Sequence, residues 1–125
     1  MLRRIDHVQL PCPEGGEPAA RRFWAELCQL PEVPKPANLL HQGGCWFEGG
    51  GVIVHIGVDR PFTPVTRAHP AFCVADIDAL AARFVAGGVT VRWSDSMPGR
   101  RSFTVDDPFG NRVEFMADGD GLSQR

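Results

Sequence analysis

The chain has 125 residues, of which 43% are hydrophobic and 22% are charged, and its formal net charge at pH 7 is −2. These values are typical of one globular domain with its own core, and they exclude disordered and fibrous proteins. The scattered arginines give no basic surface for nucleic acid, and no apolar run is long enough to span a membrane. Without a secretory signal or a C-x-x-C pair, we expect a cytoplasmic protein with reduced thiols.

The first half of the chain is predicted to contain one strand, one helix and three further strands. A strand over residues 5–10 places His7 and Gln9 on one face, because side chains alternate along a strand. A helix follows from Pro18, which suits a first helical turn, to Leu27. Glycine-rich turns separate the remaining strands, which are predicted at Asn38–His41, Cys45–Glu48 and Val52–Val58.

The second half repeats this order of elements. A strand over Ala68–Val74 leads to Asp76, a good N-cap for a helix over Ile77–Ala86 that ends at Gly87-Gly88. Asp107-Pro108-Phe109-Gly110 has the residues that a type I turn prefers, and it precedes the last strand. The three remaining strands of this half are predicted at Val89–Trp93, Arg101–Val105 and Arg112–Ala117.

The order is therefore βαβββ twice, which predicts an α+β fold of two tandem modules, about residues 3–58 and 68–117. The connection Asp59–Arg67 is too short and too apolar to be a flexible tether, so residues 1–125 are expected to form one domain. Each module alone would leave one face of a small sheet uncovered. A second module, from the same chain or from a partner, is needed to bury that face.

Four ionisable residues occupy repeat-related positions in the two modules. His7 and His69 each lie on a predicted strand that precedes a helix containing Ala-Ala-Arg. The distance along the chain is 48 residues from His7 to His55 and 45 residues from His69 to Glu114. A pseudo-twofold arrangement of the modules would bring all four to one centre. Three imidazoles and a carboxylate are a typical ligand set for a divalent metal ion.

Each of these residues also has a purely structural interpretation. A single histidine on a strand is often a core residue that is hydrogen-bonded to the backbone, and the four together could form a satisfied polar network. The correlated positions favour the metal site, because an unpaired carboxylate at Glu114, in a half-buried strand, would be costly. His41 has no repeat-related partner and is assigned to a solvated loop.

Several segments of the chain are similar to a known group of proteins. They are RIDHVQL, VIVHIGV, AHPAFCVADIDALAARFVAGGV and SFTVDDPFGNRVEF. Together they resemble the vicinal oxygen chelate superfamily, which includes glyoxalase I, bleomycin-resistance proteins, fosfomycin-resistance enzymes and extradiol dioxygenases. The resemblance covers residues 4–117. It implies paired, glyoxalase-like modules whose curved mixed sheets surround a central cavity, with the helices outside.

The resemblance also implies a set of metal ligands, because this superfamily takes them from the first and last strands of each module. His7, His69 and Glu114 match such positions. His55 matches a position at which glyoxalase I enzymes have a glutamate. The resemblance therefore leaves two roles for His55, a fourth metal ligand or a residue beside the ligands. The implied cofactor is a divalent ion, with zinc, nickel, manganese and iron all compatible. With one carboxylate ligand, the ion would keep positive charge and favour an anionic substrate.

The predicted function is a metal-dependent enzyme that acts on a small substrate chelated through its oxygens, as an isomerase, lyase, epimerase or thiol transferase. Glu114 is expected both to bind the metal and to carry a proton. Gln9 is a candidate for orienting the substrate, and Arg101, or its neighbour Arg100, is a candidate for clamping an anionic group.

Two further interpretations remain open at the level of sequence. Extradiol dioxygenation fits less well, since dioxygenases of this superfamily usually carry two module pairs and this chain has one. The main alternative is a non-catalytic small-molecule or drug-binding protein that resembles the bleomycin-resistance group. In either case a homodimer is expected, because unpaired sheet edges invite a second copy.

Overall fold

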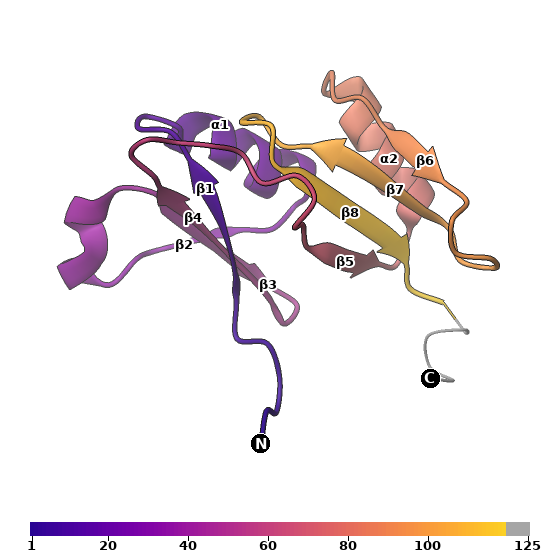
Figure 1. The fold of residues 1–125 in the computed structure, drawn as a ribbon, viewed down its shortest axis with the longest axis horizontal. Coiled ribbons are helices and arrows are strands. Elements are labelled where there is room, and N and C mark those ends of the chain that lie inside the picture. The colour runs from indigo at the N-terminus through magenta and orange to yellow at the C-terminus, as the bar shows by residue number, and fades with distance from the viewer. Residues whose placement is uncertain (120–125) are drawn as a thin grey trace. The chain divides into compact units, whose positions relative to one another are not determined.

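The computed structural model describes residues 1–119, and the chain forms two compact units (Figure 1). The first unit covers Met1–Val65, and the second begins at Thr66. The boundary falls inside the connection Asp59–Arg67 that separates the two predicted modules. In the part of the chain that the structure describes, no helix is long and apolar enough to cross a membrane.

The first unit is a four-stranded mixed sheet with helical segments. Its strand order is β1-β4-β3-β2, in which β1 runs parallel to β4 and the other pairs are antiparallel. The chain turns from a short α-helix directly into a π-helical segment, and a 3₁₀ helix lies between the second and third strands. The elements are β1 (Val8–Cys12), α1 (Glu17–Arg21), η1 (Arg22–Leu27), β2 (Glu32–Val33), η2 (Ala37–Gln42), β3 (Cys45–Gly49) and β4 (Val52–Val58).

Alternation along the strands divides this sheet into a buried face and a more open face. Leu10 of β1 and Val54 and Ile56 of β4 are buried. So are Phe23 and Trp24 of η1, whose rings meet edge to face with centroids 5.0 Å apart. Because side chains point to opposite faces at successive positions, the residues between these strand positions belong to the open face.

The second unit repeats the four-stranded mixed sheet and adds one regular helix. Its strand order is β5-β8-β7-β6, with β5 parallel to β8 and the other pairs antiparallel. The two sheets therefore share one topology, as expected for a repeated βαβββ module. The elements are β5 (Ala71–Val74), α2 (Ile77–Ala86), β6 (Arg92–Ser94), β7 (Ser102–Asp106) and β8 (Arg112–Ala117).

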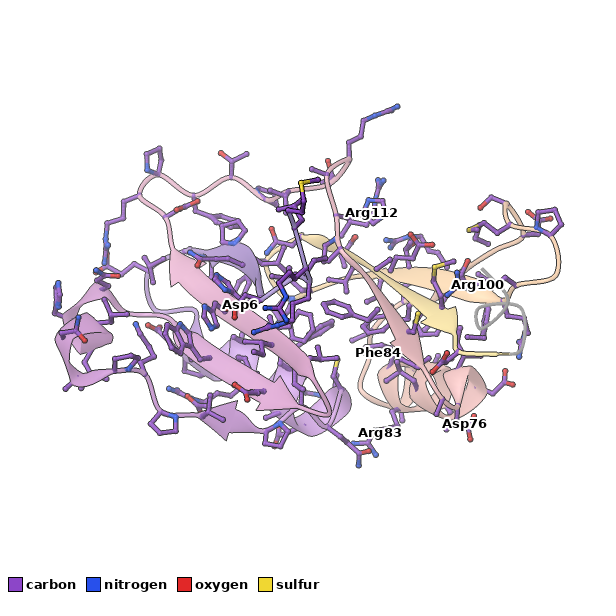
Figure 2. All side chains as sticks on the ribbon, turned by 90° about the horizontal axis from the view of Figure 1, so that it is seen from below. Asp6, Asp76, Arg83, Phe84, Arg100 and Arg112 are labelled. Atoms are coloured by element: carbon purple, nitrogen blue, oxygen red, sulfur yellow. The ribbon has the colours of Figure 1, made fainter. Side chains whose placement is uncertain are left out.

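Three phenylalanines form the centre of the second unit's core. The ring centroid of Phe84, on α2, lies 6.0 Å from that of Phe103 on β7 and 5.4 Å from that of Phe115 on β8. Phe84 is labelled in Figure 2. All three side chains are buried. The helix therefore covers the sheet face that carries Phe103 and Phe115. Glu114 and Thr104, at the alternate strand positions, belong to the opposite face.

A tight turn joins β7 to β8 and so fixes where β8, the strand that carries Glu114, begins. The Gly110 N–H donates to the Asp107 carbonyl at 3.1 Å, which confirms the predicted turn. The Asp107 carboxylate, 4% exposed, accepts hydrogen bonds from the backbone of Phe109 and from both the backbone and the side chain of Asn111. Burial raises the pKa of Asp107, although these hydrogen bonds oppose the shift.

Most predicted elements are confirmed, and one strand is wrong. β4, α2 and β8 have the predicted bounds, and Asp76 accepts a hydrogen bond from the Ala79 N–H as an N-cap. The predicted strand Asn38–His41 lies instead within the 3₁₀ helix η2, and the second strand of the unit is Glu32–Val33. The physical reason is a tight turn that starts at Pro36, whose carbonyl accepts from the Leu39 N–H at 2.9 Å.

The strands that follow His7 and His69 also begin later than predicted. His7 immediately precedes β1, which starts at Val8, and His69 lies two residues before β5, which starts at Ala71. Both histidines thus take equivalent places at the entrance of the first strand of their unit. β6 likewise begins at Arg92, three residues after its predicted start, and β7 begins at Ser102, one residue after its predicted start.

Candidate active site

In the second unit, His69 and Glu114 form a close pair at the open face of the sheet. Nε2 of His69 lies 3.0 Å from Oε1 of Glu114, and the two side chains are 26% and 22% exposed. Glu114 lies in the centre of β8, opposite Ala71 of β5 on one side and Thr104 of β7 on the other. The pairing of three strands therefore fixes the position of this carboxylate.

The hydrogen bonds of His69 determine which ring nitrogen faces Glu114 as an acceptor. Nδ1 lies 3.0 Å from the carbonyl oxygen of Arg67 and must carry the hydrogen, because a carbonyl only accepts. In a neutral imidazole, Nε2 is then an acceptor that faces a second acceptor, the carboxylate. Such a contact is favourable when the two atoms share a proton or a metal ion. The donor chemistry of this pair therefore fits a bound cation.

In the first unit, His7 and His55 lie side by side. Their ring centroids are 4.1 Å apart, with an angle of 23° between the ring planes. Nδ1 of His7 lies 2.9 Å from Oδ2 of Asp6, which accepts its hydrogen and leaves Nε2 as the free lone pair (Asp6 is labelled in Figure 2). Trp46, opposite His55 on β3, stacks on the other face of that ring at 3.8 Å.

The surroundings of His55 favour its neutral form. Burial lowers the pKa of His55, and the neighbouring His7 lowers it further by charge repulsion. Neutral imidazole is the form that ligates metals, and the stacking contacts with Trp46 and His7 engage the faces of the His55 ring rather than its nitrogen-bearing edges. His55 is thus held in an orientation and a protonation state that suit a ligand or a neighbour of the ligands.

The two units present equivalent half-sites. Each has a histidine at the entrance of its first strand and an ionisable residue within its last strand, namely His7 with His55 and His69 with Glu114. The structure brings together the members of each pair. Within residues 1–119, no group of three or more His, Cys, Asp or Glu side chains that could hold a metal ion is found. A centre built from all four residues therefore stays a prediction.

A hollow of about 450 Å³ adjoins the half-site of the second unit. His69 and Glu114 line it, together with Thr104. Two arginines, Arg92 and Arg112, also reach its wall. This half-site is therefore accessible to a small molecule and has cationic side chains beside it.

A smaller hollow, of about 190 Å³, lies on the open face of the first unit. Gln9, Lys35 and Trp46 line it. The Gln9 side chain lies over Gly57, where an added Cβ would be only 2.6 Å from the amide nitrogen of Gln9. The absence of a side chain at position 57 therefore makes room for Gln9, which the sequence singled out for substrate binding.

The structure does not bring the other candidates to either hollow. Arg101 donates to Asp78 of α2 at 2.6 Å, and its guanidinium lies 4.5 Å from the ring centroid of Trp93. Arg100 donates to the Ala117 carbonyl at 3.4 Å, so it too is held by its own unit. His41 is exposed within η2 and lines neither hollow.

Sequence reasoning missed Arg112 and Asp6. Arg112 is two residues before Glu114 on the same strand, so the period of two already places both on one face. Asp6 precedes His7 directly, and a carboxylate beside a histidine is a frequent partner for its second ring nitrogen. Arg92, by contrast, has no comparable sequence signal, because only the pairing of β6 with β7 places it opposite Thr104.

Comparison with known families identifies the chain. The model of the family described as the glyoxalase-like domain matches residues 12–116. The chain belongs to this family. It is thereby a member of the vicinal oxygen chelate superfamily, and the predicted resemblance is confirmed.

Solved structures agree with this assignment. A Bacillus anthracis protein described as a glyoxalase family member is 44% identical, with a TM-score of 0.91 over 95% of this chain and 98% of its own. The fosfomycin resistance protein FosX from Listeria monocytogenes is 18% identical, with a TM-score of 0.76 over 97% and 98%. Lactoylglutathione lyase from Agrobacterium tumefaciens is 21% identical, with a TM-score of 0.72 over 93% and 94%. The last two comparisons concern the fold. No curated protein matches the sequence.

Proposed function

We propose that this glyoxalase-like protein is a metal-dependent enzyme acting on a small substrate that chelates the metal through its oxygens. One observation supports the proposal most directly. His7 and His69 each have Nδ1 engaged by an oxygen acceptor, a carboxylate in one case and a backbone carbonyl in the other. Metal-ligating histidines almost always show this arrangement, because it fixes the tautomer and directs Nε2 to the metal.

His7, His69 and Glu114 would hold the ion, and His55 would complete the set or lie against it. These side chains belong to the types that zinc, nickel, manganese and iron accept. When bound, such an ion supplies Lewis-acid stabilisation of negative charge that develops on a substrate oxygen. The pairing of His69 with Glu114 at 3.0 Å shows that two of the proposed ligands already converge within one unit.

The remaining residues of the half-sites would position the substrate and move a proton. Glu114 is the only carboxylate among the four candidate ligands, so it is the proposed proton carrier. Gln9 can orient a substrate group by hydrogen bonds from the smaller hollow. Trp46 holds the His55 ring by stacking. Isomerase, lyase, epimerase and thiol-transferase reactions all need this combination of charge stabilisation and proton transfer.

Metal binding tests the proposal. The purified chain, stripped with a chelator, is titrated with zinc, nickel, manganese and ferrous ions, and bound metal is measured by calorimetry and elemental analysis. We expect one ion per set of ligands in the wild type and loss of binding in His7→Ala and in His69→Ala. The matched control is His41→Ala, because His41 is exposed in η2 and should leave binding unchanged.

The outcomes separate the two classes of function. If the wild type takes up none of the four ions, the metal-enzyme proposal fails. In that case the histidines and Glu114 form a polar network, and the non-catalytic small-molecule-binding protein becomes the better interpretation. If His41→Ala lowers the number of bound ions as much as His7→Ala does, binding is adventitious and the proposed ligand set is wrong.

A further inference from the structure

The wall of the larger hollow places a guanidinium beside the His69–Glu114 pair. Arg112 and Glu114 are two residues apart on β8, so both side chains lie on the same face of the strand. At a rise of about 3.3 Å per residue, their Cα atoms are roughly 7 Å apart. Within residues 1–119, no hydrogen bond or ion pair engages the guanidinium of Arg112. Arg112 is labelled in Figure 2. A half-buried guanidinium with all five donors available is a strong recognition element for a planar or tetrahedral oxyanion.

On the neighbouring strands β6 and β7, contacts of Arg92 with Thr104 and Asp106 form another part of the wall of the hollow. Arg92 of β6 donates from Nε to the Thr104 hydroxyl at 3.3 Å and from Nη2 to the Asp106 carboxylate at 2.9 Å. Because the Thr104 oxygen accepts from Arg92, its own hydrogen remains available as a donor into the hollow. Arg92 is thereby fixed and neutralised by Asp106, whereas the charge of Arg112 is left for a ligand.

The acidic groups of the hollow do not cancel this charge. Asp95 and Glu114 are the acidic residues that line it, and Asp106, opposite Arg112 on β7, is bound to Arg92. Glu114 is turned toward His69 as a candidate metal ligand. An anion that enters the hollow therefore meets Arg112 and the Thr104 hydroxyl next to the candidate metal ligands, because Thr104 pairs directly with Glu114 across the two strands.

We infer that Arg112, assisted by Thr104, binds the anionic group of the substrate, which is a small organic acid with a carboxylate or a phosphonate. Its identification as substrate rests on the proposed function, whereas the anion site itself does not. The spacing along β8 requires the anionic group to lie only a few bonds from the oxygens that would chelate the metal. The volume of about 450 Å³ accommodates such a molecule without a large apolar tail.

Direct observation of the arginine side chains tests this inference. The chelator-stripped chain is titrated separately with methylphosphonate and with acetate at constant ionic strength, while the Nε–Hε NMR signals of the arginines are followed. We expect a saturable shift of the Arg112 signal with at least one anion, and the more effective anion identifies the substrate's acidic group. Arg83, on the exposed side of α2, should not respond (Figure 2).

Variants of matched charge supply the second measurement. Arg112→Gln should weaken anion binding by about 10-fold or more, since it removes a charge-assisted bidentate contact. Arg112→Lys should retain part of the affinity, because lysine keeps the positive charge but lacks the two parallel N–H donors of the guanidinium. Arg83→Gln, which removes the same charge from the opposite side of the sheet, should bind as the wild type does. The wild-type NMR titration needs no variant, so it decides the matter even if Arg112→Gln does not fold.

Each outcome supports or overturns the inference. A saturable shift at Arg112, together with weaker anion binding by Arg112→Gln, supports it. No saturable shift with either anion, or equal weakening in Arg83→Gln, overturns it. The proposed function has its own readout in the metal titration. Anion binding at Arg112 in a chain that takes up no metal would keep the anion site and reject the metal enzyme, whereas metal binding without an anion response would do the reverse.

Discussion

At the scale of single residues, one oxygen acceptor orients each of the histidines at the strand entrances. For His69 the acceptor is the backbone carbonyl of Arg67, which no substitution removes. For His7 it is the side chain of Asp6, which also forms an ion pair with Arg4 at 3.5 Å. This difference makes the orientation of His7 open to a direct test by mutation.

Asp6→Asn should weaken metal binding without changing the stability of the fold. The carboxylate accepts the Nδ1 hydrogen of His7 and so fixes its tautomer and ring orientation, and loss of such a partner typically lowers metal affinity by about 10- to 100-fold. Asp6 is exposed, so the free energy of unfolding of the metal-free chain should stay within about 0.5 kcal/mol of wild type. Calorimetric metal titration and urea unfolding measure the two quantities.

Asp59→Asn is the matched control for this prediction, because it removes an exposed carboxylate from the connection after β4. Equal metal affinity in Asp6→Asn and the wild type would show that Asp6 does not orient a ligand. Equal weakening in Asp59→Asn would point instead to the general loss of negative charge.

The candidate ligands were predictable from the sequence because the repeat correlates their positions. Glu114 and His69 are brought together as the spacing implies, and so are His7 and His55. Arg101 shows the limit of such reasoning. Arg101 is the loop residue directly before β7, and its contact with Asp78 depends on how α2 packs against the sheet. No local sequence pattern reveals that packing.

At the scale of elements, the helices of the two units end in the same way, with a residue in the left-handed conformation, but that residue differs between them. After α2, Gly88 has φ +82°, and the Val89 N–H donates back to the Phe84 carbonyl at 2.8 Å. After η1, Gln29 takes the corresponding left-handed conformation with φ +57°, and the Leu30 N–H donates to the Trp24 carbonyl at 2.9 Å. Both are helix ends of the type that glycine favours.

Gln29→Gly should therefore stabilise the chain, and Gly88→Ala should destabilise it. Relief of left-handed strain is worth about 1–2 kcal/mol, which exceeds the roughly 0.4–1 kcal/mol that added unfolded-state entropy costs. We expect the free energy of unfolding to rise by about 0.5 kcal/mol for Gln29→Gly and to fall by about 1 kcal/mol for Gly88→Ala. Urea unfolding with unchanged m-values measures both.

The space around position 88 makes this comparison clean, because a Cβ there would have no atom within 4 Å. Any loss in Gly88→Ala is thus conformational rather than steric. A Gln29→Gly variant less stable than wild type would mean that the Gln29 side chain contributes contacts that outweigh its strain.

Elements were predictable where pattern and boundary signals agreed, as for α2 with its Asp76 cap and its glycine end. They were not predictable where a short apolar run allows two structures. Leu39 and Leu40 fit a strand by composition, yet Pro36 starts a 3₁₀ turn there. The two-residue strand β2 has no periodic pattern of its own and is defined only by its pairing with β3.

At the scale of the whole molecule, the repeated topology predicts that ligands from a first and a second unit form one centre. We expect the functional form to be a homodimer. Each sheet ends in strands with a neighbour on one side only, and β1 follows an N-terminal segment in which Met1, Leu2 and Ile5 are exposed. Light scattering should give twice the mass of one chain at micromolar concentration, and a monomer would contradict this expectation.

Metal binding by mixed variants should show whether one centre takes its two halves from one chain or from two. His7→Ala damages only the first unit and His69→Ala only the second, and each homodimer should bind no metal at its centres. The two variants are unfolded together, refolded in equal amounts and titrated with metal. Half of randomly reassembled dimers are mixed. If the centres are shared between chains, each mixed dimer regains one intact centre, and about one quarter of the wild-type capacity returns.

If each centre is built within one chain, no mixture of these variants restores any metal binding, because every chain carries one damaged unit. Refolded wild type fixes the full capacity, and each variant refolded alone fixes the baseline. Recovery well above one quarter would mean that a single half-site suffices. In that case the pairing of the two units is not required, and His69 with Glu114, already 3.0 Å apart, would be the minimal metal-binding pair.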